Sequence, residues 1–439
     1  MIKKIIITPF RKFVQIESFS GILLLIATII ALVWANSSFV DSYKSLWEYK
    51  VGFSTPILEL KKPLLLWVND GLMAIFFFLI GLEIKREFLI GELNSLKKIS
   101  FPLFGAIGGM SVPVLFYIFL NNNPDTSVGW GIPMATDIAF SLAVLNVLGD
   151  RVPLSLKVFL TAFAIVDDIG AVLVIAIFYS GNIDFMLLVY AFILLGILYA
   201  LAFRGYYSKY IITSLGIIIW ILFLKAGIHP TLAGILVAFS VPIRQKIDTP
   251  SFIENLEQIT DNIKKAKISS DPVLSKEQIA EIDCLQYWTD RYQSPVQRIE
   301  HNLHGWVAYF IIPIFALANA GVAFSSATAI DTAIVINIII CLVLGNSIGI
   351  STIVLLAKKF KIIEVPKDIG NKHIIGVAFL AGIGFTMAIF IAGLAFKNNP
   401  VYIDSAKIGI LIGSLISAVI GFAVLRWSNS NKVEPEKIN

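Results

Sequence analysis

Residues 154–180 read LSLKVFLTAFAIVDDIGAVLVIAIFYS, an apolar stretch interrupted by two adjacent aspartates, Asp167 and Asp168. A bilayer core of about 30 Å is crossed by about 20 apolar residues in a helix. The aspartates lie thirteen and fourteen residues after Leu154, near the middle of such a helix. Placing one charged group there costs about 2.5 to 3.5 kcal/mol, so carboxylates at that depth are candidates for function.

The same apolar pattern recurs along the 439-residue chain. Hydrophobic residues make up 57% of it and charged residues 15%, whereas ordinary globular proteins have about 25% charged residues. A soluble fold cannot bury so much apolar surface, so we predict an all-α polytopic membrane protein with about twelve transmembrane helices. The apolar runs lie at about 17–35, 64–84, 101–120, 130–148, 154–180, 185–203, 210–224, 229–243, 306–324, 332–357, 374–396 and 406–426.

Basic residues between these runs predict the orientation. Alternate connections carry Lys and Arg, whereas the connections at 121–129, 181–184 and 325–331 carry none. Because cytoplasmic loops are enriched in Lys and Arg, both termini are predicted to be cytoplasmic. Residues 36–63, with four lysines, are predicted to form a small structure on the opposite, extracellular or periplasmic side.

One long connection differs in composition from the rest. Residues 244–304 hold 18 of the 65 charged residues and no run of spanning length. We therefore predict a charged cytoplasmic linker between the eighth and ninth spans, with helical stretches near 251–267 and 275–290. The chain as a whole, residues 1–439, is interpreted as a single transmembrane transporter domain.

Several functional classes are disfavoured by composition. Two cysteines and four histidines without ligand spacing predict neither a disulfide scaffold nor a transition-metal site. No phosphate-cradling motif occurs, which disfavours an ATP-driven pump. We expect no cofactor, no nucleic-acid partner and no enzymatic activity.

Backbone interruptions accompany the carboxylates. Gly129, Gly131 and Pro133 precede Thr136 and Asp137 within one predicted span, and a proline inside a helix kinks or breaks it. A lone aspartate often only bonds two helices together, but adjacent aspartates point about 100° apart and cannot share one partner.

A second interruption, AGIGFT at 381–386 with Gly382 and Gly384, lies in the eleventh predicted span. For a glycine pair alone, close helix packing is an equally good explanation. Two broken helices in corresponding halves of a membrane protein nevertheless predict inverted repeats with an ion site where the breaks meet.

At these residues the chain resembles the NhaA family of bacterial Na+/H+ antiporters. The resemblance rests on long ungapped stretches over essentially all spans: LWVNDGLMAIFFFLIGLEIKRE (66–87), GWGIPMATDIAF (129–140), FAIVDDI (163–169), KAGIHPTLAG (225–234), FALANAGV (315–322) and GIGFTMAIF (382–390). It implies two broken helices crossing at the ion site and a location in the bacterial cytoplasmic (inner) membrane. It also implies exchange of cytoplasmic Na+ or Li+ for external H+ that is electrogenic and regulated by pH, and it allows a homodimer.

By this resemblance, Asp167 and Asp168 are the essential pair that holds Na+ or Li+ and protons. Asp137 and Thr136 belong to the unwound helix at the ion site, with Pro133, Gly382 and Gly384 as supports of the breaks. The residues implied to respond to pH form a cluster near the cytoplasm: Glu83, Lys85, Arg86 and Glu87.

One residue departs from the family pattern. Asn346 stands where the family usually has a lysine that is thought to pair with the first aspartate, here Asp167. Asparagine cannot carry a charge or take up and release a proton as lysine does, so the inherited H+ to Na+ stoichiometry is in doubt. Gly345 and Gly349 around it form a small-xxx-small pair suited to close helix crossing.

Two further polar residues have open interpretations. His229 is a candidate pH sensor, because its unperturbed pKa is about 6.5, but a packing role is favoured. Asp70 either lines the outer mouth or is a satisfied structural group. Two other functions remain as alternatives: a Na+-coupled organic-anion symporter on the same plan, and a cation channel.

Overall fold

The computed structural model describes residues 2–55, 60–265, 273–323, 330–397 and 399–428, with side chains described except for residues 2–18, 92, 96 and 150. Helices dominate it, and the strands within these ranges form one short antiparallel pair that aligns Lys50 with Pro63. The elements of the first half are α1 (Ile2–Ala35), α2 (Val40–Glu48), β1 (Lys50–Val51), β2 (Lys62–Pro63), α3 (Leu64–Leu66), η1 (Trp67–Leu72), α4 (Met73–Ile90), η2 (Glu92–Asn94), α5 (Leu96–Leu120), η3 (Pro124–Met134), α6 (Ile138–Val147), η4 (Gly149–Arg151) and α7 (Leu154–Phe178). The second half contains α8 (Phe185–Phe203), α9 (Lys209–Lys225), α10 (Thr231–Ser240), α11 (Thr249–Lys265), α12 (Lys276–Tyr292), α13 (Pro295–Trp306), η5 (Val307–Ile311), α14 (Ile312–Asn319), α15 (Thr332–Ile340), η6 (Cys341–Gly345), α16 (Asn346–Lys359), α17 (Asn371–Ala381), α18 (Phe385–Ala395) and α19 (Pro400–Arg426).

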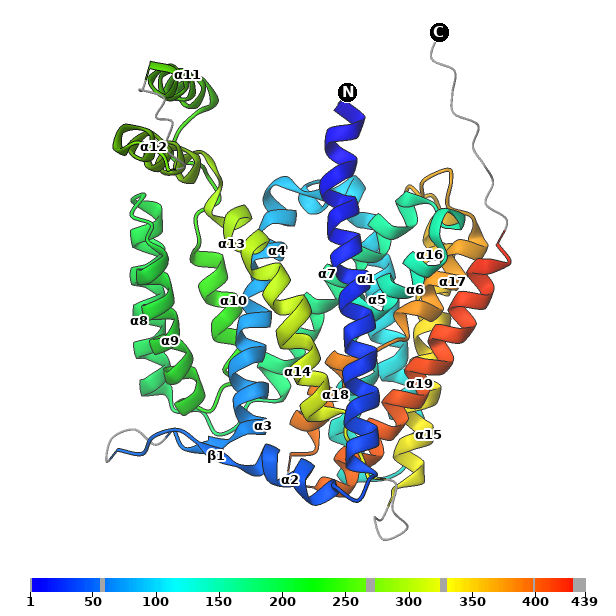
Figure 1. Ribbon diagram of the computed structural model, residues 1–439. Coiled ribbons are helices and arrows are strands. Elements are labelled where there is room, and N and C mark those ends of the chain that lie inside the picture. The colour runs from blue at the N-terminus through cyan, green and yellow to red at the C-terminus, as the bar shows by residue number, and fades with distance from the viewer. Residues whose placement is uncertain (1, 56–59, 266–272, 324–329, 398, 429–439) are drawn as a thin grey trace.

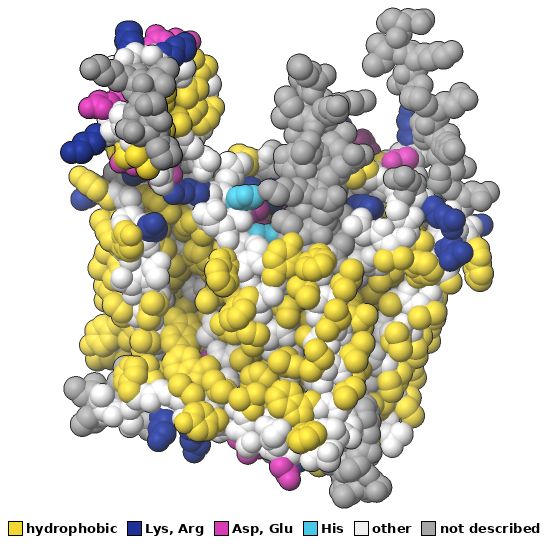
Figure 2. Space-filling view, in the orientation of Figure 1, with side chains coloured by type: hydrophobic (Ala, Val, Ile, Leu, Met, Phe, Trp, Pro, Cys, Tyr) yellow, Lys and Arg dark blue, Asp and Glu magenta, His cyan; other side chains and the backbone are white. Residues whose placement is uncertain are grey.

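Each predicted apolar run falls on a helix, which confirms the all-α membrane architecture. Within the described ranges, seven helices are long and apolar enough to span by themselves, and up to ten spans result if each of three bent pairs counts as one. The two remaining runs form α9, of 17 residues, and α10, of 10 residues. Figure 2 shows a broad apolar band between two ends that carry the charged side chains, the surface expected of a multi-pass membrane protein.

The two ends of the bundle differ. The start of α1, the end of α19 and helices α11 and α12 lie at one end, which we call the linker end, whereas α2 and the β1–β2 pair lie at the other, the hairpin end (Figure 1). The helices α11 and α12 lie close to the stretches expected from the sequence, although residues 266–272 fall outside the description, as do 325–329 of the basic-free connection 325–331.

The ninth span begins earlier than its apolar run. A continuous helix starts at Pro295, inside the stretch 244–304 assigned to the linker, and runs through α13, η5 and α14 to Asn319. Proline suits the first turn of a helix because its missing N–H is not needed there. The charged residues of α13 hide the beginning of this span from a sequence-based prediction. They do not face lipid, because Arg298 pairs with Asp290 and Glu300 pairs with Arg86.

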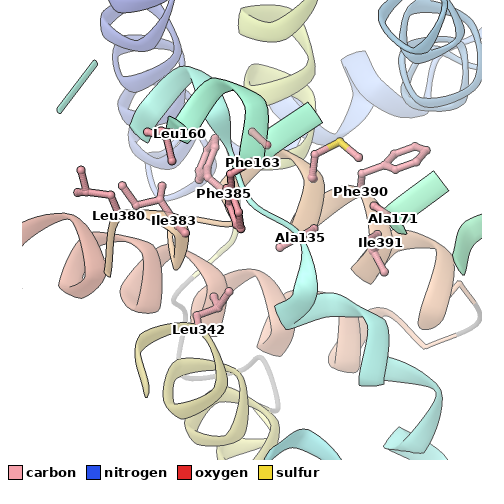
Figure 3. Packing of buried hydrophobic residues seen from close by; sticks show 14 of the residues in the cluster. Ala135, Leu160, Phe163, Ala171, Leu342, Leu380, Ile383, Phe385, Phe390 and Ile391 are labelled. Atoms are coloured by element: carbon pink, nitrogen blue, oxygen red, sulfur yellow. The ribbon is translucent and has the colours of Figure 1, made fainter. Parts of the chain in front are cut away.

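Close helix contacts hold the bundle around the breaks. The small-residue pair predicted at Gly345 and Gly349 lies against α5, where a Cβ on Gly349 would clash with the carbonyl oxygen of Gly108. Figure 3 shows buried side chains from both interrupted segments, among them Ala135, Ile383 and Phe385, in one hydrophobic cluster that also includes Leu342. This packing places the two helix breaks beside α7.

Candidate functional site

The two helix breaks bond directly to each other. Between η3 and α6, which meet at a 46° bend, the backbone N–H of Asp137 donates to the carbonyl of Ile383 at 2.6 Å. The second break, a 42° bend between α17 and α18, returns two hydrogen bonds, because the backbone N–H and hydroxyl of Thr386 donate to the Asp137 carboxylate at 3.0 and 2.7 Å. The Thr136 hydroxyl completes the junction by donating to the carbonyl of Ala381 at 2.9 Å.

Local sequence explains why these breaks occur. Pro133 closes η3, the backbone is extended at Ala135 and Asp137, and Asp137 caps α6 by accepting the N–H of Phe140 at 3.2 Å. Gly382 and Gly384 permit the second break to pack closely against its neighbours. A Cβ on Gly382 would meet the carbonyl oxygen of Leu342, and a Cβ on Gly384 would meet that of Ala135. The same carboxylate therefore accepts hydrogen bonds from the N-terminal turns of α6 and α18, whose positive dipole ends favour an anion there.

The paired aspartates of α7 lie beside this junction in different surroundings. Asp167 is 1% exposed, and one carboxylate oxygen accepts the backbone N–H of Thr136 at 3.1 Å. The other oxygen is buried and has no hydrogen-bond partner in the described part of the chain. Asp168 is partly exposed and accepts no hydrogen bond from the described part of the chain. Three other carboxylates, on Asp167, Glu83 and Asp137, lie close enough to act on it electrostatically. A cation or a proton at Asp168 would relieve this accumulation of negative charge.

Asn346 reaches the same unwound segment from α16. Its side chain is 0% exposed, and its amide donates to the carbonyl of Pro133 at 3.0 Å. Its side-chain carbonyl oxygen is buried, and no described residue donates a hydrogen bond to it. It therefore satisfies one of the backbone carbonyls freed by the break. Asp167 and Asn346 thus bond the segment 133–136 from two helices and leave two buried oxygen atoms unpaired.

Comparison with known proteins identifies the relatives of this chain. A family described as "Na+/H+ antiporter 1" matches residues 11–425. The chain belongs to this Na+/H+ antiporter family. It is 45% identical to the Na+/H+ antiporter NhaA of Oleidesulfovibrio alaskensis over 98% of this chain and 96% of that protein, and 42% identical to that of Wolinella succinogenes over 93% and 91%. The NhaA of Bacteroides fragilis is 40% identical over 96% and 98%. The resemblance found in the sequence is thereby confirmed, and the family is one of transporters.

The residues implied to respond to pH in the antiporter family form contacts at the linker end. The Lys85 ammonium group donates to the carbonyls of Phe239 and Val241, which lie at the C-terminal end of α10 and carry its negative dipole end. Arg86 pairs with Glu87 and, at 2.8 Å, with Glu300 of α13. The fourth residue, Glu83, is the one that acts electrostatically on Asp168. The cluster therefore links α4 to α10 and α13 and reaches toward the paired aspartates.

Asp70 and His229 come together at the hairpin end. The Asp70 carboxylate pairs with Lys62 at 3.0 Å and lies 4.0 Å from the His229 ring nitrogen Nε2. The other ring nitrogen of His229 lies 2.8 Å from the Thr231 hydroxyl, and the ring meets the edge of Phe390. The group joins β2, η1 and the turn before α10, so both residues have structural partners.

Some site residues have no sequence signal that identifies them. Thr386 lies within the second interruption, but nothing in that stretch indicates that it bonds to Asp137, 249 positions away. Glu300, the partner of Arg86, is 214 positions away, in a stretch whose composition predicts a linker.

Proposed function

We propose that this protein exchanges cytoplasmic Na+ or Li+ for external H+ in a bacterial inner membrane and so contributes to sodium and pH homeostasis. The observation that carries the proposal is Asp168, a partly exposed carboxylate that accepts no hydrogen bond from the described residues. Three other carboxylates act on it electrostatically, beside the two helix breaks. Carboxylate, hydroxyl and carbonyl oxygens suit a hard cation such as Na+ or Li+. Membership of the Na+/H+ antiporter family supports the same pair of ions.

Within this proposal the carboxylates have separate roles. Asp137 already accepts hydrogen bonds from the first turns of α6 and α18, so it holds the break together and compensates two helix dipoles. Asp168 accepts no hydrogen bond from the described residues and serves as the shared ligand for Na+ and H+. Thr136 positions Asp167 through its backbone N–H. Exchange follows if the site changes sides only when Asp168 holds a proton or a cation.

Asp167 is proposed as the second proton carrier. When both aspartates release protons for each Na+, one net charge crosses the membrane per cycle and exchange is electrogenic. A neutral Asn346 supplies no counter-charge, so in this chain the charge of Asp167 is balanced by Na+ or by its own proton. The cluster of Glu83, Lys85, Arg86 and Glu87 is proposed to regulate exchange by pH, because Glu83 acts on Asp168 and the others join α4 to its neighbours.

The orientation is part of the proposal. Basic residues in the connections at the linker end favour that end as cytoplasmic, with both termini and residues 244–304 there and 36–63 on the outside. Na+ leaving the cell then enters the site from the linker end, where the cluster around Glu83 lies. The homodimer that the resemblance allows stays a prediction.

Transport by reconstituted vesicles tests this function. Vesicles that enclose a pH-sensitive dye are expected to show proton movement when Na+ or Li+ is added, and none with choline. Uptake of a labelled organic anion driven by Na+, without proton movement, would instead indicate a symporter, and conductance far above transporter turnover would indicate a channel.

Voltage dependence tests the two-proton scheme in the same vesicles. One net charge moving against 100 mV changes the driving force by about 2.3 kcal/mol, which alters the equilibrium Na+ ratio about 50-fold. We expect an imposed potential to change the exchange rate and the final Na+ gradient. Exchange that ignores voltage would contradict the proton-carrying role of Asp167 and leave exchange at Asp168 intact.

A further inference from the structure

The linker leaves and rejoins the bundle at one place. The backbone N–H of Lys246, which follows α10, donates to the carbonyl of Arg291 near the end of α12 at 2.9 Å. Close by, the Ser294 hydroxyl, which precedes α13, donates to the carbonyl of Ile243 at 2.6 Å. These two hydrogen bonds connect the segment that leaves the bundle after α10 to the segment that returns to it before α13.

A cavity of about 350 Å³ lies beside this junction, between the α8–α9 turn, the end of α12 and α13. Its lining includes four cationic side chains and one carboxylate: Lys209, Lys246, Arg291, Arg298 and Asp290. Asp290 pairs with Arg298 at 2.8 Å, whereas the other three form no ion pair within the described residues. Figure 2 shows basic side chains gathered between the linker helices and the apolar surface below them. Asp290 neutralises Arg298, and the remaining three cations repel each other unless a further anion lies between them.

Aromatic side chains orient two of these cations, Arg291 and Lys246, and one N–H donor of Arg291 has no acceptor among the described residues. The Arg291 guanidinium lies 5.1 Å from the ring centre of Tyr287 and donates to its hydroxyl, and the Lys246 ammonium lies 6.0 Å from the ring centre of Tyr207. The Nε–H of Arg291 is buried and finds no acceptor among the residues that the structure describes. A buried donor left unpaired is destabilising, so an acceptor at this position would be stabilising.

We propose that this cavity binds a phosphate-bearing anion. A guanidinium presents several donors in a fixed fork that matches phosphate oxygens, and lysines add point charges. The volume lies within the range of small-molecule sites, about 300 to 1,000 Å³, which leaves room for the group that carries the phosphate. Such a ligand bonds Lys209 of α9 to Lys246 and Arg291 of the linker and so holds the linker against the transport bundle.

Two kinds of molecule can supply the phosphate of the proposed ligand. Three aromatic residues lie close in sequence to the cavity-lining Tyr207 and Lys209. They are Phe203, Tyr206 and Tyr210, which are 94%, 71% and 73% exposed, as is typical of residues at a membrane interface. An anionic lipid would place its phosphate in the cavity and its chains along α8 and α9. A soluble phosphate compound would enter from the aqueous side. The inference concerns the linker end and does not depend on the proposed exchange.

Thermal unfolding of the purified full-length protein tests the site, because a ligand that binds only the folded state raises the unfolding midpoint. The lipid probe is short-chain phosphatidylglycerol, compared with phosphatidylcholine. The soluble probe is potassium pyrophosphate, compared with potassium chloride at equal ionic strength, so that Na+ stays absent. We expect one probe to raise the midpoint saturably, and the responding probe identifies the source.

Matched variants identify the location. The responding probe is expected to bind the Lys246→Gln/Arg291→Gln variant at least about tenfold more weakly. The control variant, Lys265→Gln/Lys276→Gln, loses the same charge from the linker outside the cavity, and we expect it to bind the probe with unchanged affinity. Lys209→Gln, an exposed change on the bundle side, tests the site without disturbing the linker junction and is expected to weaken binding too. Equal affinity in cavity and control variants, or no response to either probe, would overturn the inference.

Discussion

Vesicles that contain an Asp168→Asn variant are expected to show no proton movement when Na+ or Li+ is added. Asparagine is similar in size but cannot hold a proton and lacks the charge that attracts a cation. Because Asp168 accepts no hydrogen bond from the described part of the chain, the substitution leaves the α7 packing unchanged. The loss is therefore a loss of transport and not of fold, and the vesicle pH dye measures it.

Asp125→Asn is the matched control for this experiment. Asp125 is exposed at the start of η3, at the hairpin end, so its charge is lost without touching the junction of the breaks. We expect normal exchange from this control and the same elution volume for both variants in size-exclusion chromatography. Normal exchange by a folded Asp168→Asn variant would refute the assigned role of Asp168.

A Gly349→Leu variant is expected not to accumulate as folded protein. Gly349 faces α5 where a Cβ would meet the carbonyl oxygen of Gly108 and the side chain of Val112. Backbone atoms cannot move aside as a flexible side chain does, so α16 must separate from α5. That separation displaces Asn346, which bonds to the segment 133–136, and so disturbs the ion site as well as the packing.

Gly196→Leu is the matched control for the packing prediction. Gly196 lies in α8, and a Cβ there would meet nothing within 4 Å, so the leucine extends into open space or lipid. We expect wild-type yield and unfolding midpoint for this control in a detergent thermal-stability assay. Equal yields of both leucine variants would show that the crossing of α5 and α16 tolerates a large side chain.

The sequence predicts most of this fold because lipid imposes a simple constraint. A spanning backbone must satisfy its hydrogen bonds internally, so long apolar runs become helices, and the run at 154–180 forms α7. Carboxylates in such runs are costly enough to stand out, which is why Asp137, Asp167 and Asp168 are identified as a group. Prolines and glycines then mark both breaks.

Tertiary partners are less predictable. The pairing of Arg86 with Glu300 and of Asp70 with Lys62 and His229 depends on how the helices pack, which no local pattern encodes. The early start of α13 at Pro295 is hidden because its charges pair with protein. The cavity between Lys209 and Arg291 arises only once the linker folds back on the α8–α9 turn.

Proton release on Na+ binding tests the central claim, that Asp168 holds either a proton or an alkali cation. Isothermal titration of the purified protein with NaCl, in two buffers of different ionisation enthalpy, measures Na+ binding and proton release together. We expect protons to leave as Na+ binds, and the Asp168→Asn variant to show neither event. Saturable binding of Na+ without any release of protons would contradict the account.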